Sequence, residues 1–163
     1  MGARSLTGAL GLQKEVNMKY VGKVNLFSDG GSKGNPGPGS IAILICCQDN
    51  KLLHEYSECI GHCTNNQAEY KALIKGLDYC AKYTRGDVVC FSDSELIIKH
   101  MNGQYRLKND ELRSLYHDVV KNANVFKSVT YQHVPRTNQR IQRADKLVKQ
   151  AHEGRCINKT HNA

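Results

Sequence analysis

The stretch FSDGGSKGNPGPGS, residues 27–40, places one acid at the end of an apolar strand and follows it with five glycines and two prolines. A tight hairpin needs only two residues of the Asn-Gly type, so this connection is longer than a plain turn requires. Its polar residues are Asp29, Ser32, Lys33 and Asn35. We therefore expect a ligand-binding segment between two strands, with Asp29 where the first strand ends.

Three strands and a helix are predicted around this segment. Residues 20–28 alternate between apolar and polar side chains, residues 41–47 read IAILICC, and residues 52–60 read LLHEYSECI. The short turn between the second and third runs favours an antiparallel meander of all three. The period then changes, because Thr64 and Gln67 form a capping-box pattern that opens a helix.

The second half of the chain alternates strands with helices. Residues 88–91, VVCF, lack alternation, as expected of a central strand covered on both faces. A short helix ends at residues 102–103, Asn109 caps another helix, residues 125–134 form the fifth strand, and a last helix contains residues 144–151. This order predicts an α/β fold with a five-stranded mixed sheet flanked by helices.

The length and charge of the chain limit its organisation and its partners. The 163 residues suit one domain, which we place at residues 18–153, between a leader at 1–17 and a polar tail at 154–163. A net charge of +8 favours a polyanionic partner such as nucleic acid. The sequence has no apolar run of membrane-spanning length and no signal-peptide pattern, so we expect a cytoplasmic protein without a membrane partner.

The seven cysteines do not form a recognisable metal-binding motif. Most of them lie in apolar runs, where a thiol behaves as a small hydrophobic group. Cys59 and Cys63 form a CxxxC pair with His62 beside it. No second pair follows at the spacing of a zinc finger, so a zinc site is not expected.

Four acids are predicted to meet at one edge of the sheet. Asp29 and Asp93 follow the first and fourth predicted strands, and ligands of α/β sheets bind at strand ends. Glu69 and Asp145 border the apolar stripes of two helices. Each acid alone is more simply explained as a solvated or helix-terminal residue. Together, four converging carboxylates would repel one another unless cations lay among them, and such oxygen ligands suit Mg²⁺ or Mn²⁺.

Four segments of the chain resemble ribonuclease H of type 1. They are DGGSKGNPGPG at 29–39, TNNQAEYKALIKGL at 64–77, FSDSELIIKHMNG at 91–103, and HVPR with ADKLVKQA at 133–151. They occur in the order of that family and cover about residues 20–153. The resemblance implies a ribonuclease H-like sheet, with three antiparallel strands followed by two parallel ones. It also implies hydrolysis of the RNA strand of RNA–DNA hybrids with two metal ions per site.

The resemblance also assigns roles to individual residues. It implies that Asp29, Glu69, Asp93 and Asp145 are the catalytic carboxylates and the ligands of two Mg²⁺ (or Mn²⁺) ions. Glu69 is further expected to bond the 2′-hydroxyl group that distinguishes RNA from DNA. The residues expected to line the substrate groove are Gly30, Ser32, Asn35, Asn65, Asn66, Gln67 and Ser94.

Two features depart from the best-known bacterial members of that family. Residues 103–110, GQYRLKND, replace a long basic protrusion, and the chain has no tryptophan, so it resembles the compact archaeal-type subgroup. Substrate affinity must then come from scattered charges, including Lys33, Arg106, Lys108 and a loop at 136–143.

The second departure is in the loop before the last acid. Many family members carry a mobile histidine there that assists product release, but residues 134–145 contain none. His133 is expected to belong to the fifth strand. Arg136, Asn138 and Arg140 are the candidates to replace the loop histidine, and we count Arg136 and Asn138 among the substrate-binding residues.

Two other functions share parts of this pattern. A non-catalytic protein that binds RNA–DNA hybrids would keep the groove, although it would be expected to lose one of the four acids. A transposase or integrase core shares the fold and the metals, but its acids follow a different order along the chain. A monomer is expected, and double-stranded RNA stays open as a second partner.

Overall fold

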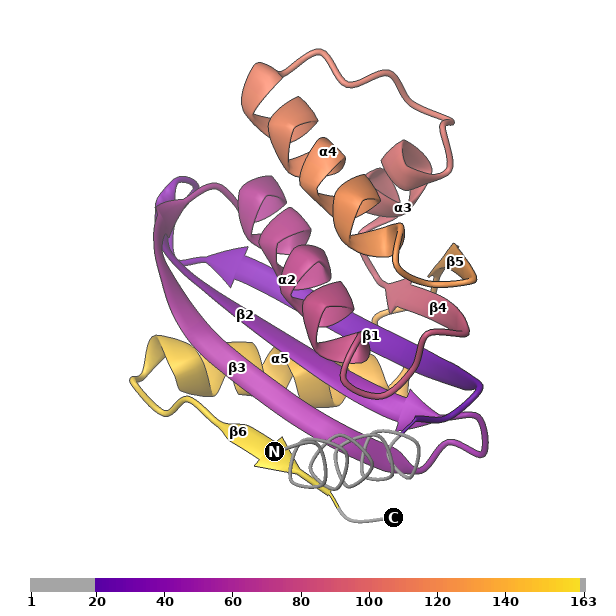
Figure 1. The fold of residues 1–163 in the computed structure, drawn as a ribbon. Coiled ribbons are helices and arrows are strands. Elements are labelled where there is room, and N and C mark those ends of the chain that lie inside the picture. The colour runs from indigo at the N-terminus through magenta and orange to yellow at the C-terminus, as the bar shows by residue number, and fades with distance from the viewer. Residues whose placement is uncertain (1–19, 162–163) are drawn as a thin grey trace, which may run out of the picture.

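The computed structural model describes residues 20–161, which form one six-stranded sheet with helices on both faces (Figure 1). The strands lie in the order β5-β4-β1-β2-β3-β6. Their bounds are β1 Lys23–Ser32, β2 Gly37–Cys47, β3 Leu52–Cys63, β4 Asp87–Ser92, β5 Ser128–His133 and β6 Asn158–Thr160. The helices are α2 Asn65–Cys80, α3 Glu95–Met101, α4 Asp110–Ala123 and α5 Gln139–His152. The predicted α/β class and the order of the first nine elements are confirmed.

The sheet combines an antiparallel half and a parallel half that meet at β1. β1 pairs with β2 in antiparallel register and with β4 in parallel register, and β5 continues the parallel half. The predicted arrangement of three antiparallel and two parallel strands is therefore confirmed. β6 adds a sixth, antiparallel strand beside β3 that the sequence pattern did not predict.

The first strand is longer than predicted, and the glycine-rich stretch is mostly part of the sheet. β1 continues past Asp29 to Ser32, and Gly30 pairs with Ile41 of β2. The connection between the two strands is therefore only residues 33–36. Glycines have low strand propensity, so the pattern predicted a loop where backbone pairing with β2 in fact continues the strand.

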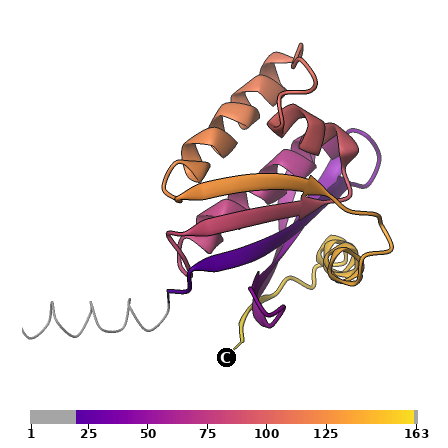
Figure 2. The same cartoon turned by 90° about the vertical axis from the view of Figure 1, so that its right-hand side faces the viewer.

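Helices cover both faces of the sheet, with α2 on one face and α5 on the other (Figures 1 and 2). Each face carries its own hydrophobic core. Alternation along β1 turns Leu26 towards the core beneath α2 and Phe27 towards the core beneath α5. β2 is buried on both faces, with Ile43 in the first core and Leu44 in the second. This double covering fixes β1 at the centre of the sheet, with Asp29 near its C-terminal end.

The polar tail expected at residues 154–163 is attached to the sheet over its described part. β6 pairs with β3 from His54 to Tyr56, and Ser57 and Ile157 are joined by two hydrogen bonds. A three-residue polar strand has no alternation that a pattern can detect. Residues 158–160 form a strand because they pair with β3.

The expected loop at residues 136–143 is mostly helix. Asn138 is the N-cap of α5, since its side chain accepts hydrogen bonds from the backbone N–H groups of Arg140 and Ile141. Arg140 and Arg143 therefore lie on the first turns of a helix, and the loop between β5 and α5 is limited to residues 134–138. The first residues of α5 are mostly polar, so the sequence shows no apolar helical period there.

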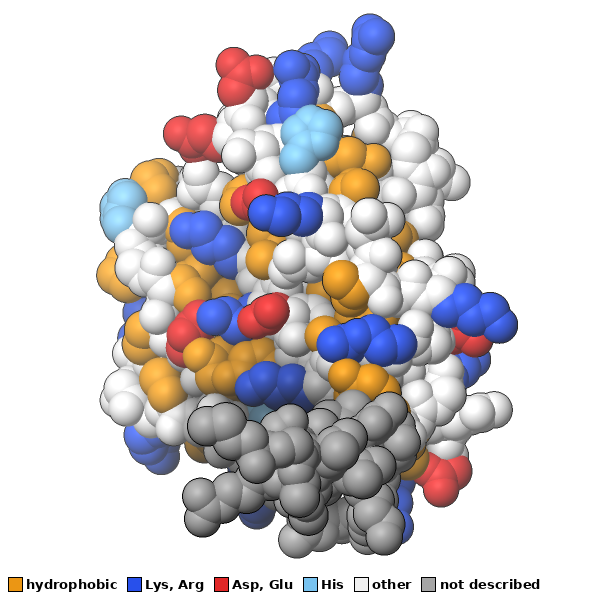
Figure 3. Space-filling view, viewed as in Figure 1, with side chains coloured by type: hydrophobic (Ala, Val, Ile, Leu, Met, Phe, Trp, Pro, Cys, Tyr) orange, Lys and Arg blue, Asp and Glu red, His pale blue; other side chains and the backbone are white. Residues whose placement is uncertain are grey.

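The remaining expectations concern the ends, the membrane and the surface charge. The leader expected at residues 1–17 lies outside the described residues. Within residues 20–161, no helix combines the length and the apolar character needed to cross a membrane. Figure 3 shows Lys and Arg side chains spread over the face that carries α2 and α4, rather than gathered in one patch.

Candidate active site

Three carboxylates from three different elements meet at the C-terminal ends of the parallel strands. Asp29 lies on β1, Asp93 follows β4, and Glu69 lies on α2. An oxygen of each carboxylate lies within 4.8 Å of an oxygen of the other two. Phe27 of β1 pairs with Phe91 of β4, so this parallel register brings the two aspartates, each two residues further on, side by side.

Glu69 reaches this site because β1 and α2 are in very close contact. The backbone N–H of Gly30 donates to Glu69 Oε1 at 2.6 Å. A Cβ atom at Gly30 would lie 2.4 Å from the carbonyl oxygen of Ala68, so glycine permits this approach. The predicted capping box is present, with Thr64 and Gln67 bonded reciprocally, and it fixes where α2 begins.

The electrostatics of the site favour a bound cation. Burial, together with the negative charges of Asp93 and Asp145, raises the pKa of Asp29 to about 7. Burial also raises the pKa of Glu69 well above its usual range, and the negative charge of Asp29 adds to this effect. Carboxylates that resist ionisation together are the donor set that a divalent metal ion stabilises. The three acids therefore fit a divalent metal site.

Asp145 lies beside this cluster but not within it. It projects from α5, on the opposite face of the sheet from α2, and its side chain is 47% exposed. Its Oδ2 atom forms an ion pair with Lys149 Nζ at 2.9 Å. Its charge nevertheless contributes to the raised pKa of Asp29. Of the four predicted acids, the structure thus brings three into mutual contact and places the fourth within electrostatic range.

Two further residues reach Asp93 from β5 and the loop that follows it. Arg136 Nε lies 3.5 Å from Asp93 Oδ2, and the arginine side chain is 90% exposed while that of Asp93 is 15% exposed. His133 is the last residue of β5, as predicted, and its Nε2 atom lies 3.3 Å from the Asp93 carbonyl oxygen. Sequence reasoning assigned His133 no role at the site. The parallel register of β4 and β5, which pairs Ser92 with His133, is what places it there.

Three of the predicted groove residues form one hydrogen-bonded set beside the acids. Asn65 Oδ1 accepts from the backbone N–H of Ser32 at 2.9 Å and from its hydroxyl at 3.0 Å. The backbone N–H of Asn65 donates to Asn35 Oδ1 at 3.0 Å. These bonds join the turn between β1 and β2 to the N-terminus of α2. They hold a polar, accessible surface next to Asp29.

Three other predicted groove residues are helix-capping residues in the structure. Gln67 belongs to the capping box of α2 and also bonds Glu111 of α4. Ser94 and Asn138 are the N-caps of α3 and α5. Their side chains are thus already engaged by backbone N–H groups. Asn66 lies half-buried in the first turn of α2.

Comparison with known proteins places this chain in a family. The family model described as "Reverse transcriptase-like" matches residues 27–151, which contain all four acids. Ribonuclease HI of Halobacterium salinarum is 34% identical over 130 residues, covering 80% of this chain and 64% of that protein. The chain belongs to the ribonuclease H family. A bifunctional protein of Mycobacterium tuberculosis is 37% identical over 130 residues, but this chain spans only 35% of its length.

Solved structures of ribonucleases H1 share the fold. The crystal structure of the Halobacterium salinarum enzyme superposes with a TM-score of 0.78 at 33% identity, covering 82% of this chain and 100% of that chain. The structure of LC11-RNase H1 in complex with an RNA/DNA hybrid superposes with a TM-score of 0.74 at 33% identity, covering 80% of this chain and 97% of that chain. The match to an archaeal ribonuclease HI agrees with the resemblance to the compact subgroup.

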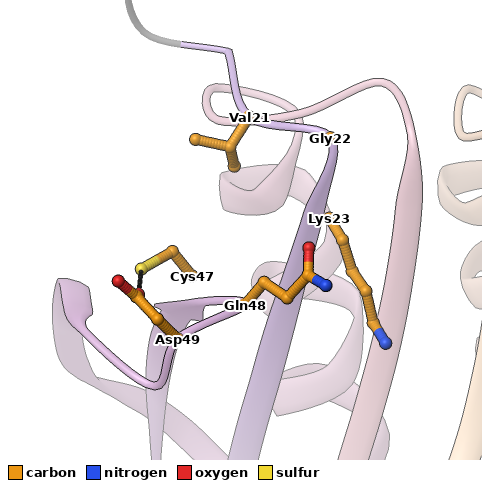
Figure 4. A pocket seen from close by; sticks show the side chains of 6 residues that line it. All are labelled: Val21, Gly22, Lys23, Cys47, Gln48 and Asp49. Carbon is orange, nitrogen blue, oxygen red and sulfur yellow. Dashed lines mark hydrogen bonds between the residues drawn. The ribbon is translucent and has the colours of Figure 1, made fainter.

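A pocket of about 520 Å³ lies at the opposite end of β1 from the ribonuclease H acids (Figure 4). Val21, Gly22 and Lys23 line it together with Cys47, Gln48 and Asp49. Asp29 lies six residues after Lys23 along β1, which corresponds to a distance of about 20 Å. This pocket is therefore not part of the acid site.

Proposed function

We propose that the protein is an endoribonuclease that hydrolyses the RNA strand of RNA–DNA hybrids. The observation that carries the proposal is the cluster of Asp29, Glu69 and Asp93, whose carboxylate oxygens lie within 4.8 Å of one another. Membership of the ribonuclease H family supports the reaction class. The complex of LC11-RNase H1 with an RNA/DNA hybrid supports the substrate.

We propose two Mg²⁺ ions as the cofactors, with Mn²⁺ as a substitute. Asp29, Glu69, Asp93 and Asp145 would hold them, and Asp145 would exchange its ion pair with Lys149 for this role. Bound divalent ions supply electrostatic stabilisation of the charge that develops on phosphate oxygens and lower the pKa of water. Gly30 holds the Glu69 carboxylate in place through its backbone N–H, so this ligand needs little reorganisation.

The hybrid would bind across the polar surface formed by Ser32, Asn35 and Asn65. Hydroxyl and amide groups of this kind recognise sugar and base edges in the wide minor groove of an A-like helix. Arg136 is exposed beside Asp93 and can contact a phosphate there. One chain carries all four acids, and we therefore propose that a monomer is sufficient for the reaction.

Gel analysis of cleavage tests this proposal. Labelled RNA–DNA hybrid, duplex RNA, duplex DNA and both single strands are incubated with the protein and Mg²⁺, with Mn²⁺, and with excess EDTA. We expect cleavage of the RNA strand of the hybrid with either metal and none in EDTA. The duplex RNA arm shows whether this substrate is also cut. Undiminished cleavage in EDTA, or cleavage of the DNA strand, would contradict the proposal.

A further inference from the structure

Two exposed cysteines that the proposed reaction does not use lie together where α5 ends. Cys59 belongs to β3, and its thiol donates a hydrogen bond to the Ala151 carbonyl oxygen in the last turn of α5 at 2.9 Å. Cys156 lies between α5 and β6, and the pKa of its thiol is raised first by burial and further by the neighbouring Cys59 thiol. Both cysteines are free thiols in the structure.

The backbone on both sides of Cys156 is fixed. The preceding residue, Arg155, donates its backbone N–H to the Gln150 carbonyl oxygen at 2.9 Å. The following residue, Ile157, donates its N–H to Ser57 Oγ at 3.0 Å and accepts from the Ser57 N–H at 2.9 Å. Cys156 is therefore held between the end of α5 and the part of β3 that carries Cys59. Because Ile157 is bonded to Ser57, Cys156 lies next to the residue that faces β3 two positions before Cys59.

We propose that Cys59 and Cys156 form a reversible intramolecular disulfide that fastens residues 154–160 to β3. Hydrogen peroxide is a sufficient oxidant. One thiolate attacks a peroxide oxygen, the O–O bond breaks, and a sulfenic acid and water are produced. The second thiol attacks the sulfur of the sulfenic acid, the S–O bond breaks, and the disulfide forms with release of a second water molecule. Peroxide is reduced by two electrons and the two thiols are oxidised.

The other cysteines are poorly placed to compete for this reaction. Four of them, Cys46, Cys63, Cys80 and Cys90, are buried, whereas Cys59 and Cys156 are exposed and accessible to peroxide. Cys47 is half-buried at the C-terminal end of β2, and its thiol bonds the Asp49 carboxylate. The disulfide would close a loop of about 100 residues, a length for which restriction of the unfolded chain is large. We therefore expect oxidation to stabilise the protein.

Peptide mapping of the full chain tests the proposal. The protein is treated with stoichiometric hydrogen peroxide, alkylated, and digested with trypsin without reduction. Cys59 and Cys63 share the peptide 52–71, and Cys156 lies in the peptide 156–159. We expect these two peptides to be joined and two hydrogen atoms lighter than their sum. Cys63→Ser should keep the link and Cys59→Ser should abolish it.

Thermal unfolding gives an independent measurement. Oxidation should raise the Tm by about 5–15 °C, and dithiothreitol should reverse the rise. Cys156→Ser should show no such shift while keeping the hybrid-cleaving activity of the reduced wild type. Alkylated Cys156 after oxidation, a link that survives in Cys59→Ser, or a covalent dimer on a non-reducing gel would each overturn the proposal. These outcomes are independent of whether the protein cleaves RNA.

Discussion

The backbone N–H of Gly30 donates to Glu69 Oε1 at 2.6 Å, so a strand residue next to one acid holds the carboxylate of another. This bond requires β1 and α2 to be closer than any side chain at position 30 allows, because a Cβ atom there would lie 2.4 Å from the Ala68 carbonyl oxygen. The geometry of the acid cluster therefore depends on a glycine that has no chemical role of its own.

Gly30→Ala should separate α2 from β1 and displace Glu69. We expect a loss of about 1–3 kcal/mol in the free energy of unfolding and a clear loss of cleavage activity. Gly31→Ala is the matched control, because the nearest atom to its Cβ would be Asn65 Oδ1 at 3.9 Å, an ordinary contact. Urea unfolding and initial cleavage rates measure both effects. Equal effects of the two substitutions would contradict this account of Gly30.

The raised pKa of Asp29 predicts that the metal-free protein loses stability as the pH rises. The pKa is about 7 in the folded protein, against an ordinary value of 3.8. The folded state therefore binds the proton of the Asp29 carboxyl group more tightly than the unfolded state does. Its contribution to stability is present below about pH 4 and is lost as the pH rises through about 7.

Urea unfolding in EDTA at about pH 5 and about pH 8 tests this dependence. Between these two pH values the free energy of unfolding should decrease in both proteins, and the decrease should be about 1–3 kcal/mol larger in the wild type than in Asp29→Asn. Mg²⁺ should restore much of the wild-type stability at the higher pH, because it replaces the proton among the carboxylates. Identical decreases in wild type and variant would show that Asp29 is not the titrating group.

The order of the elements and the placement of two of the acids could be predicted because these features depend on local sequence patterns. Period changes, the capping box at Thr64 and the apolar run at 88–91 depend on nearby residues alone. Asp29 and Asp93 follow from the rule that side chains gather at the ends of parallel strands. Other features depend on pairing between distant segments. β6 is ordered by β3, and His133 reaches Asp93 through the β4–β5 register.

The missed start of α5 is a different case, since a signal was present. Asn138 precedes the helix at the position where an N-cap residue is preferred. The expectation that Asn138 binds substrate obscured this structural role. The same competition affected Ser94, whose side chain caps α3, whereas the capping role of Gln67 was predicted from its spacing to Thr64. A single polar residue before a helix, without a capping-box partner, does not show whether its side chain faces a ligand or the backbone of the helix.

The buried carboxylate of Glu55 should contribute to the attachment of α5 and the C-terminal segment. Its side chain is 6% exposed, and it bonds Arg143 Nε at 2.8 Å and His161 Nε2 at 3.1 Å. Burial opposes ionisation, but the bonds from these two partners lower the pKa of Glu55 below its usual value. Its stabilising effect is thus present above about pH 4.5 and lost as the pH falls further.

Glu55→Gln should cost about 1–3 kcal/mol in the free energy of unfolding at neutral pH, because Arg143 loses its charged partner. Glu58→Gln is the control on the same strand. Its side chain is 32% exposed and pairs with Lys75 at 3.6 Å, so we expect a cost below about 1 kcal/mol. Urea unfolding of both variants measures the two costs. A larger cost for Glu58→Gln than for Glu55→Gln would refute the stabilising role of Glu55.

Binding of the hybrid should depend only moderately on salt. On the face shown in Figure 3 the basic side chains are spread rather than gathered in one patch. We therefore expect only some of them to contact phosphates at once. We expect the logarithm of the binding constant to fall with the logarithm of salt concentration with a slope shallower than about −7, which corresponds to fewer than about eight phosphate contacts. Fluorescence anisotropy with the non-cleaving Asp93→Asn variant measures the slope. A steeper slope would contradict this expectation, because it would require more phosphate contacts.

Asp93→Asn distinguishes an enzyme from a protein that only binds hybrids. The substitution keeps the shape of the side chain, 15% exposed beside Arg136, but removes one charge and one strong metal ligand. Cleavage should fall by about 10²–10³-fold or more, because stabilisation of the developing negative charge is lost. Hybrid binding should persist, since Ser32, Asn35 and Asn65 are unchanged.

The metal-free stability of the same variant supplies the control. It should stay level or rise slightly, because a carboxylate that raises the pKa of Asp29 has been neutralised. Asp110→Asn alters an acid whose side chain is 94% exposed on α4, and it should change neither cleavage nor stability by more than a small amount. Normal cleavage by Asp93→Asn would mean that the acid cluster has a structural role only. Unfolding of both variants would lead to the same conclusion, because a remote surface acid would then matter as much as one in the cluster.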